Sequence, residues 1–282
     1  MPGMKWTFMS LQILDEVRSG KMTFAEMFPR ARAAGFVAYD ASDMDAEFAD
    51  REEVLRLCRE NGLKIADYIH WIHMATPDDK ALEAAIESGK QAVHTALAHG
   101  TKMLMIVEQV NRHDLEKLTR QEASRRMGCA LREIVNYADK FGVTVMVEDF
   151  PVPALPMSTS DEMKELLDAA PGLQLILDTG NMLAQKEDPL HFYQALKGHY
   201  AHVHLKDIEY PENATTGDID CDGRHIWNAQ HGEGVVNFAA LLPDLKQDGF
   251  DGCVTVEYGP HEGTKDHFEK MAESIRYLEG LL

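Results

Sequence analysis

The chain alternates between short apolar runs and longer amphipathic segments. The apolar runs are rich in Val, Ile, Leu and Met and predict strands. Eight of them occur, at residues 5–9, 36–41, 63–70, 101–108, 143–150, 173–180, 199–207 and 250–259. Between the runs, apolar residues recur at helical spacing, as Leu82, Ile86 and Val93 do. Strands that alternate with helices predict parallel pairing through right-handed crossovers.

Residues that start and end helices agree with this alternation. Three Thr-x-x-Glu capping boxes begin at Thr23, Thr119 and Thr159, and two cap residues precede a proline, Thr76 and Asp188. The predicted helices end at glycines, which readily adopt the left-handed conformation of a helix end. These glycines are Gly35, Gly62, Gly100, Gly142, Gly172, Gly198, Gly249 and Gly280.

Eight strand–helix units predict an α/β protein, a (β/α)8 TIM barrel with a single domain over residues 1–282. The alternative is a doubly wound open sheet. Such a sheet often has a glycine-rich phosphate turn after its first strand, and the sequence has none there. The barrel is therefore the prediction.

Composition and charge narrow the class of partner. The chain carries 28 Lys and Arg against 47 Asp and Glu, a net charge of −19. This charge argues against nucleic acid, because phosphate-binding surfaces need clustered cations. No apolar run approaches the roughly 20 residues that span a bilayer, so we expect no membrane segment. Four scattered cysteines without a CxxC pair favour reduced thiols and a cytoplasmic location.

Polar residues stand at the predicted carboxyl ends of the strands, where the chemistry of a barrel is located. They are Asp40, His70, Glu108, Glu148, Asp178, His204 and Glu257. The last four come from four successive strands and so can converge on one ion. Three carboxylates and one imidazole favour a divalent cation such as Mn²⁺, with Mg²⁺, Co²⁺ or Zn²⁺ as alternatives. The competing interpretation is that these acids pair with basic residues, of which Lys206 is the clear candidate.

Four segments carry a resemblance to a known family. VMVEDF, LILDTGN, HVHLKD and VTVEYG occur in that order, and HGEGVVNF follows the third. Together they resemble the xylose isomerase-like barrels called sugar phosphate isomerases/epimerases, which include tagatose 3-epimerase-type enzymes and inosose isomerases and dehydratases. The resemblance implies that Glu148, Asp178, His204 and Glu257 are metal ligands. It also implies that Glu148 and Glu257 are the catalytic acid and base.

The sequence departs from this pattern at two places. Many epimerases of the group have a substrate-binding histidine at the position of Asn181, which can donate a hydrogen bond but cannot carry a proton near neutral pH. The arginine expected after the seventh strand also has no obvious match. Both departures weigh against epimerisation of the tagatose type.

The resemblance implies a divalent-metal-dependent isomerase or epimerase acting on a ketose or keto-polyol through an enediolate. A lyase or dehydratase acting on a keto-sugar or inosose needs the same ligands and stays open. A non-catalytic sugar-binding barrel is a third reading. The abasic-site endonucleases of the superfamily need a cationic groove, which the net charge of −19 opposes. The resemblance also implies a small sugar or keto-polyol as the partner and the homo-oligomers that are frequent in the superfamily.

Several neighbouring residues are predicted to bind substrate: His70, Trp71, Glu108, Asn181, His202 and Lys206. His202, His204 and Lys206 alternate along one strand and therefore face the same way. Each has a structural alternative: ion pairs of Lys206 with Asp207 or Glu209 and of Glu108 with Arg112, and ordinary packing for the others.

The segment 209–236 lacks clear periodicity and is predicted to be a lid or specificity loop. Within it, residues 218–223 imitate the start of a calcium loop. The twelfth position is Ala229 instead of glutamate, so we expect a solvated acidic loop.

Overall fold

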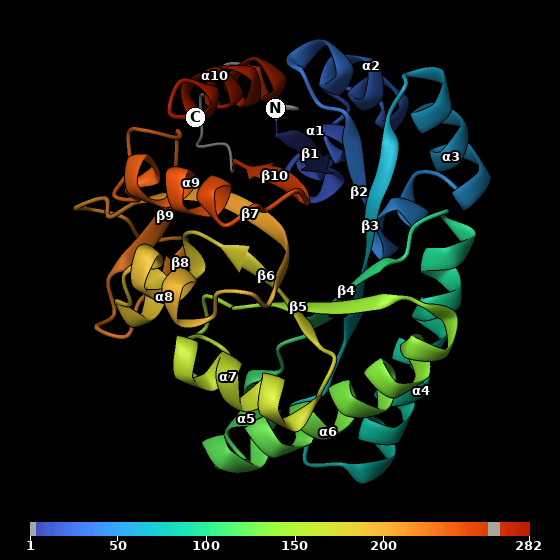
Figure 1. The fold of residues 1–282 in the computed structure, drawn as a ribbon, viewed down its shortest axis with the longest axis vertical. Helices are drawn as coiled ribbons and strands as arrows, with labels where there is room; N and C mark the ends of the chain where they lie inside the picture. Colours follow the sequence, from blue (N-terminus) through green and yellow to red (C-terminus); the bar gives the residue numbers. More distant parts are fainter. Residues whose placement is uncertain (1–3, 259–265) are drawn as a thin grey trace.

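The computed structural model describes residues 4–258 and 266–282. Eight parallel strands form a closed barrel, as predicted, and helices surround it (Figure 1). The barrel strands are β1 (Lys5–Met9), β2 (Ala38–Ser42), β3 (Lys64–Ile72), β4 (Met103–Glu108), β5 (Thr144–Glu148), β6 (Gln174–Asp178), β7 (Tyr200–Glu209) and β10 (Cys253–Glu257). Strand β10 closes the barrel, because it pairs in parallel with both β1 and β7. The final residue of the predicted strand 250–259 and parts of the predicted 1–282 domain lie outside the described residues.

The described residues contain ten α-helices, two more than predicted. They are α1 (Leu14–Arg18), α2 (Phe24–Ala34), α3 (Arg51–Glu60), α4 (Asp79–Ala98), α5 (Arg112–Leu115), α6 (Arg120–Ala138), α7 (Ser160–Ala169), α8 (Pro189–Ala195), α9 (Phe238–Gln247) and α10 (His267–Glu279). Short 3-10 helices occur at Ser10–Gln12, Asp43–Glu47, Asp139–Phe141 and Asn181–Gln185. The two extra helices, α1 and α5, are single turns in the loops after β1 and β4. None of the described helices is long and apolar enough to cross a bilayer.

Seven of the eight predicted glycines have a positive φ, but α7 and α8 end at Ala169 and Ala195, three residues before Gly172 and Gly198. The predicted caps hold with one exception. All three capping boxes are formed, and Asp188 caps α8. The prediction for α4 was wrong by two residues: Asp78 caps this helix, and Thr76 instead accepts a hydrogen bond from the Asp78 amide. Gly280 was also wrongly predicted to be left-handed, since it ends α10 with a φ of −65°. Each of the eight barrel strands is followed by a helix, as predicted.

Apolar side chains form two layers around the strands. The larger core lies between strands and helices and is rich in aromatic residues, such as Phe8, Phe28 and Tyr39. A smaller cluster fills the barrel interior: Met9, Ile69, Met105, Val107, Met146 and Ile176. Side chains two positions apart on a strand face the same side. Met146 and Ile176 therefore share the interior with Glu148 and Asp178, so these two acids lie directly above the apolar side chains of this cluster.

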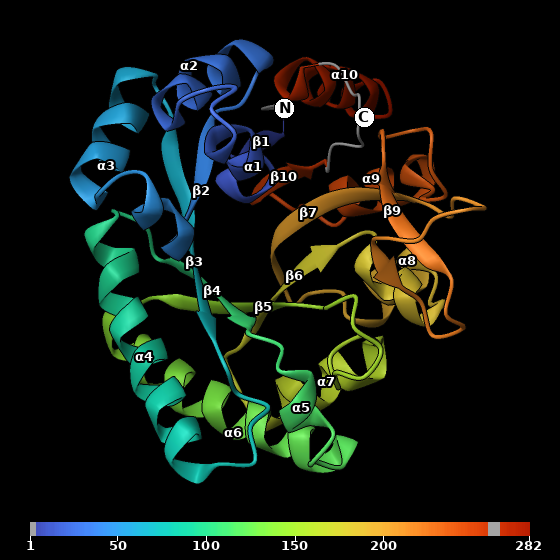
Figure 2. The same ribbon diagram turned by 180° about the vertical axis from the view of Figure 1, so that it is seen from behind.

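The segment 209–236 contains a β-hairpin, which the sequence did not predict. Strand β9 (His225–Ala229) pairs antiparallel with the end of β7, and β8 (Asp218–Ile219) pairs with β9. Figure 2 shows this hairpin beside α8. Asp220 closes the turn, because its Oδ1 accepts the amides of Asp222 and Arg224. The acidic motif is thus used as a hairpin turn.

Asp207 fastens the chain that returns from the hairpin to the barrel. Its Oδ2 accepts the amides of Gly232 and Gly234, and its Oδ1 accepts the amide of Val236. A Cβ on Gly234 would lie 2.2 Å from the Asp207 carboxylate, so glycine is required at this close approach. The long segment is therefore held in place from the strand that carries His204.

Candidate metal centre

Four polar side chains converge inside the barrel from its last four strands. Glu148, Asp178 and Glu257 are the final residues of β5, β6 and β10. His204 lies within β7 opposite Asp178 in the register. One ligand atom from each of the four lies within 4.8 Å of each of the others. The structure thus brings together the four residues that the sequence singled out as metal ligands.

The candidate ligand atoms face one another at short distances. His204 Nδ1 lies 2.6 Å from Glu148 Oε1 and 3.6 Å from Glu257 Oε2. Asp178 Oδ1 accepts the amides of Gly180 and Asn181, which leaves only Oδ2 for the centre. Glu148 Oε1, Asp178 Oδ2 and His204 Nδ1 are buried and have no hydrogen-bond partner among the described residues. Buried ligand atoms without a hydrogen-bond partner fit a divalent cation, which they would coordinate.

Lys206 supplies the protein's own positive charge at this centre. Its Nζ lies 2.6 Å from Glu257 Oε1 and 3.1 Å from Asp178 Oδ2, and donates a 2.8 Å hydrogen bond to Asn181 Oδ1. The sequence alternative paired Lys206 with Asp207 or Glu209; instead, its ammonium group lies among the candidate ligands. A divalent ion together with this ammonium group balances the three carboxylate charges, which buried charges require.

The pKa values of the acids reflect burial and this lysine. Burial raises the pKa of Asp178 to about 7, against the opposing effect of Lys206. Burial also acts to raise the pKa of Glu257, but Lys206 and His204 outweigh it and lower that pKa to about 2. Although burial opposes it, Asp178 and Glu257 raise the pKa of Lys206 well above its usual value. The lysine is therefore charged at neutral pH.

The turn after β6 holds Lys206 in place. A Cβ on Gly180 would lie 2.9 Å from Lys206 Cγ and Cδ, so the missing side chain leaves room for the lysine stem. Asn181 Nδ2 donates to the carbonyl of Asp149, and this bond turns Oδ1 toward Lys206. Asn181, predicted to bind substrate, is buried and contacts the lysine.

A cavity of about 470 Å³ opens onto the centre. Glu148, His204 and Glu257 line it, together with Trp71 from β3, one of the residues predicted to bind substrate. The remaining lining residues are Met9, Leu11, Gln12, Asp15, Glu16, Ile69, Met105, Val107, Phe150 and Asn228. Sequence reasoning missed those from the loop after β1 and from the hairpin. Met105 and Val107 could have been predicted to face the barrel interior, because they alternate on β4.

The other predicted substrate-binding residues have protein partners. His70 Nε2 lies 2.9 Å from Ser88 Oγ of α4, and its Nδ1 lies 2.7 Å from Asp43 Oδ2. His202 Nε2 lies 2.7 Å from Thr255 Oγ1 within the barrel. Neither His70 nor His202 lines the cavity.

Glu108 is 1% exposed and organises the loop after β3. Its carboxylate accepts the amides of Met74 and Ala75 and lies 2.9 Å from His73 Nδ1. The alternative ion pair with Arg112 is not formed within the described part of the chain.

A second group of buried acids lies below the centre. Asp40 Oδ2 accepts hydrogen bonds from Thr7 and Thr255. Burial raises the pKa of Asp40, and burial together with the Asp40 charge raises the pKa of Asp67 well above its usual value. Asp40 is among the polar strand ends predicted from the sequence, whereas Asp67 is not. Its alternation with Ile69 and Trp71 on β3 was the available signal.

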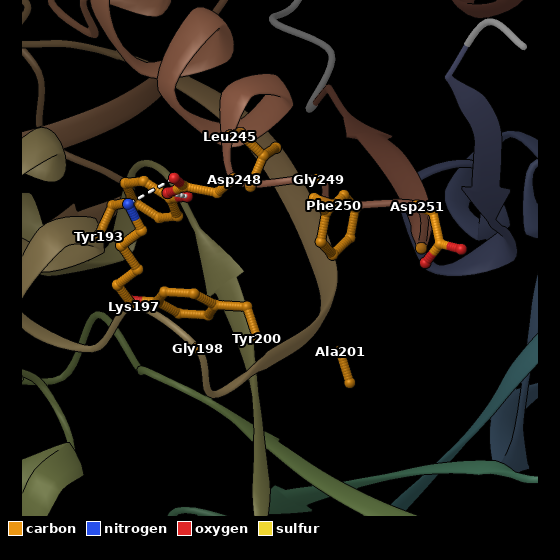
Figure 3. A pocket seen from close by; sticks show the side chains of 11 residues that line it. Tyr193, Lys197, Gly198, Tyr200, Ala201, Leu245, Asp248, Gly249, Phe250 and Asp251 are labelled. Atoms are coloured by element: carbon orange, nitrogen blue, oxygen red, sulfur yellow. Dashed lines mark hydrogen bonds and ion pairs between the residues drawn. The ribbon is translucent and has the colours of Figure 1, made fainter. Parts of the chain in front are cut away.

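A further hollow of about 330 Å³ lies at the opposite end of the barrel, where β7 begins (Figure 3). Lys197 and Tyr193 both contact the Asp248 carboxylate there. Residues at this end of a TIM barrel normally contribute to stability. The hollow lies away from the four convergent donors.

The closed barrel and its four convergent donors define an α/β barrel with a candidate divalent-metal centre. Residues 14–281 match the family model described as Xylose isomerase-like TIM barrel. The chain belongs to this family.

Comparison with individual proteins gives distant and mixed relatives. The inosose dehydratase of Lacticaseibacillus casei is 19% identical over 235 residues, which cover 78% of this chain and 77% of the relative. The L-ribulose-5-phosphate 3-epimerase UlaE of Escherichia coli strain SE11 is 26% identical over 246 residues, covering 81% and 80%. The solved structure of the IOLI protein with a zinc atom has a TM-score of 0.77 at 18% identity, over 98% of this chain and 96% of that one. The family and the donor set together indicate a metal-dependent sugar isomerase or epimerase, or a dehydratase.

Proposed function

We propose that this protein is a divalent-metal-dependent isomerase or epimerase of a ketose or keto-polyol. The observation that carries the proposal is the position of the two glutamates. Glu148 and Glu257 come from the two ends of the four-strand arc β5–β6–β7–β10, and both line the cavity. Asp178 and His204 lie between them in this arc. Two carboxylates in this arrangement suit proton transfer on opposite sides of one substrate carbon.

The residues of the chain have distinct tasks in this proposal. The bound cation would be held by Glu148, Asp178, His204 and Glu257 and would supply Lewis-acid stabilisation for an enediolate. Glu148 and Glu257 remove and return the proton. Return to the same carbon gives epimerisation, and return to the neighbouring carbon gives isomerisation. Lys206 neutralises charge on a substrate oxygen, and Trp71 packs against the sugar ring.

The oxygen-rich donor set favours Mn²⁺ as the working ion. Zinc is the alternative that the zinc-containing IOLI structure supports. The four free thiols, at Cys58, Cys129, Cys221 and Cys253, agree with the proposed reducing, cytoplasmic location.

Dehydration is the second candidate function, and the inosose dehydratase relative supports it. The same proton abstraction leads to elimination when a hydroxyl group lies next to the enediolate. In that case, the acid returns its proton to the leaving hydroxyl group, which departs as water.

Proton exchange in D₂O separates these reactions. The Mn²⁺-loaded protein is incubated with ketoses, 3-keto-sugars and inososes, and the products are followed by NMR. Deuterium in an intact carbon skeleton supports isomerisation or epimerisation, and an unsaturated product supports dehydration. No reaction with any compound, despite bound metal, would contradict both.

The variants Glu148→Gln and Glu257→Gln test the assigned roles. We expect each to lower the exchange rate at least about 10²-fold, because a positioned acid or base contributes roughly 10²–10⁴. Glu133→Gln, an exposed change on α6, is the matched control and should exchange normally. Normal exchange by either active-site variant would refute its assignment.

A further inference from the structure

The cavity of about 470 Å³ at the candidate metal centre is called the metal cavity below. A hollow of about 550 Å³, called the second hollow, adjoins it. Trp71 and Phe150 line both spaces, so the two meet along these aromatic side chains. The remaining lining residues of the second hollow are Asp43, Met44, Glu108, Gln109, Val110, Arg112 and Val152. We propose that this hollow is a subsite for a second, uncharged ring, so that the substrate is a glycoside whose keto-sugar ring reacts at the metal centre. This inference rests on the proposed function, whose site it extends.

The sizes of the two spaces support a substrate with two parts. Small-molecule sites commonly measure roughly 300–1,000 Å³, so each space is large enough for a ligand group of its own. The metal cavity of about 470 Å³ accommodates the reacting ring. The adjoining hollow is no smaller, and a monosaccharide at the metal centre would leave it unused.

The chemistry of the second hollow suits a neutral ring. Trp71 and Phe150 offer aromatic faces, and Met44, Val110 and Val152 add apolar contact. Gln109 and the exposed Arg112 can donate hydrogen bonds to hydroxyl groups.

A phosphate group fits this hollow less well. Asp43 lines it, and the hydrogen bond from His70 lowers the pKa of this acid against the effect of burial. Asp43 is therefore negatively charged at neutral pH and would repel an anion that Arg112 attracts. A glycoside is favoured over a sugar phosphate for this reason.

Helix α5, which carries Arg112 on one side of the hollow, is held in place before substrate binds. His73 bridges the buried Glu108 and Asp114 of α5, with Nδ1 2.9 Å from Glu108 Oε1 and Nε2 3.0 Å from Asp114 Oδ2. Glu108 also accepts the amides of Met74 and Ala75 in the loop after β3. These linked contacts fix α5 against the end of β3, and so the hollow exists before substrate binds. A preformed subsite avoids part of the ordering cost of binding.

The test compares one-ring and two-ring substrates on the Mn²⁺-loaded protein. The probes are 3-keto-D-glucose, the corresponding 3-keto-cellobiose, and D-fructose 6-phosphate, with kcat/KM for deuterium exchange as the readout. We expect the two-ring compound to exceed the one-ring compound at least tenfold. Equal values for these two probes, or a preference for the phosphorylated ketose, would overturn the subsite.

Two variants locate the preference in the hollow. Val110→Trp fills the space and Arg112→Met removes a donor, and each should lower the two-ring to one-ring ratio at least fivefold. Arg125→Met, an exposed change on α6, is the control and should keep the ratio of the unmodified protein. An unchanged ratio in Val110→Trp would place the second ring elsewhere.

Direct binding keeps this inference separate from the proposed reaction. Calorimetry with cellobiose and glucose needs no turnover, and we expect cellobiose to bind at least tenfold more tightly. This difference should disappear in Val110→Trp. Tight cellobiose binding without exchange on any probe would contradict the proposed reaction and support the subsite. Exchange without any preference for two rings, in binding or turnover, would support the proposed reaction and contradict the subsite.

Discussion

At the scale of single residues, Lys206 places a positive charge at the centre. Its ammonium group contacts Asp178 and Glu257, two of the four candidate ligands. An incoming divalent ion must therefore share these acids with a positive charge that the protein already holds. The lysine stabilises the metal-free protein, because three acids would otherwise repel one another inside the barrel.

Replacing Lys206 by methionine separates these two effects. We expect the affinity for Mn²⁺ to rise at least tenfold, which corresponds to about 1.4 kcal/mol, because the competing charge is lost. We expect the metal-free variant to lose about 3 kcal/mol of unfolding free energy, since it leaves buried acids uncompensated. Calorimetric metal titration and urea denaturation measure the two quantities. Lys164→Met on α7 is the exposed control, and weaker metal binding by Lys206→Met would contradict this account.

The convergence of the four candidate ligands could be predicted because barrel strands place their polar ends at one edge. A carboxylate at the end of a strand that is otherwise apolar is costly to bury, and this made Glu148, Asp178 and Glu257 conspicuous. The direction in which the neighbours turn was harder to predict. The sequence predicts a substrate contact for His70 but not its partners Ser88 and Asp43, which are distant in sequence.

At the scale of elements, the loops after the strands differ most from expectation. The eight barrel strands have a clear apolar signal, whereas α5 is a single turn that its side-chain contacts hold in place. The hairpin in 209–236 depends on pairing between β9 and the end of β7, a contact that no local pattern encodes. Hydrophobic periodicity therefore predicted the scaffold but not the loops that shape the cavity.

His73 links two of these elements and should make stability depend on pH. Its hydrogen bond to Glu108, opposed by burial and aided by Asp114, raises its pKa to about 9. A raised pKa means that the native protein holds this proton more tightly than the unfolded chain does. The stabilisation is therefore complete below the unfolded pKa of about 6.5 and is lost as the pH rises through 9.

The variant His73→Gln tests this link. We expect it to be less stable than the unmodified protein by about 2–3 kcal/mol at pH 6, with the difference disappearing by about pH 10. Urea denaturation across this pH range measures it. His113→Gln, an exposed change on α5, should show no such trend, and a difference independent of pH would contradict the assigned ion pairs.

At the scale of the whole molecule, one closed barrel supplies both the scaffold and the centre. The parallel order β1 to β7 and then β10 brings the last four strands side by side, and this order follows from the chain itself. Its interior holds a small apolar cluster, which includes Met146 and Ile176, and a buried polar group around Asp40 below the donors. The family match over residues 14–281 agrees with this architecture. The reaction itself depends on the substrate, which the shared scaffold does not specify.

The central claim is that Glu148, Asp178, His204 and Glu257 hold one divalent cation. Crystals of the protein soaked in Mn²⁺ and measured near the manganese absorption edge test it directly. We predict a single strong anomalous peak among these four side chains, within bonding distance of Glu148 Oε1, Asp178 Oδ2, His204 Nδ1 and a carboxylate oxygen of Glu257. A fully soaked crystal without a peak there, or with its only strong peak elsewhere, would contradict the account.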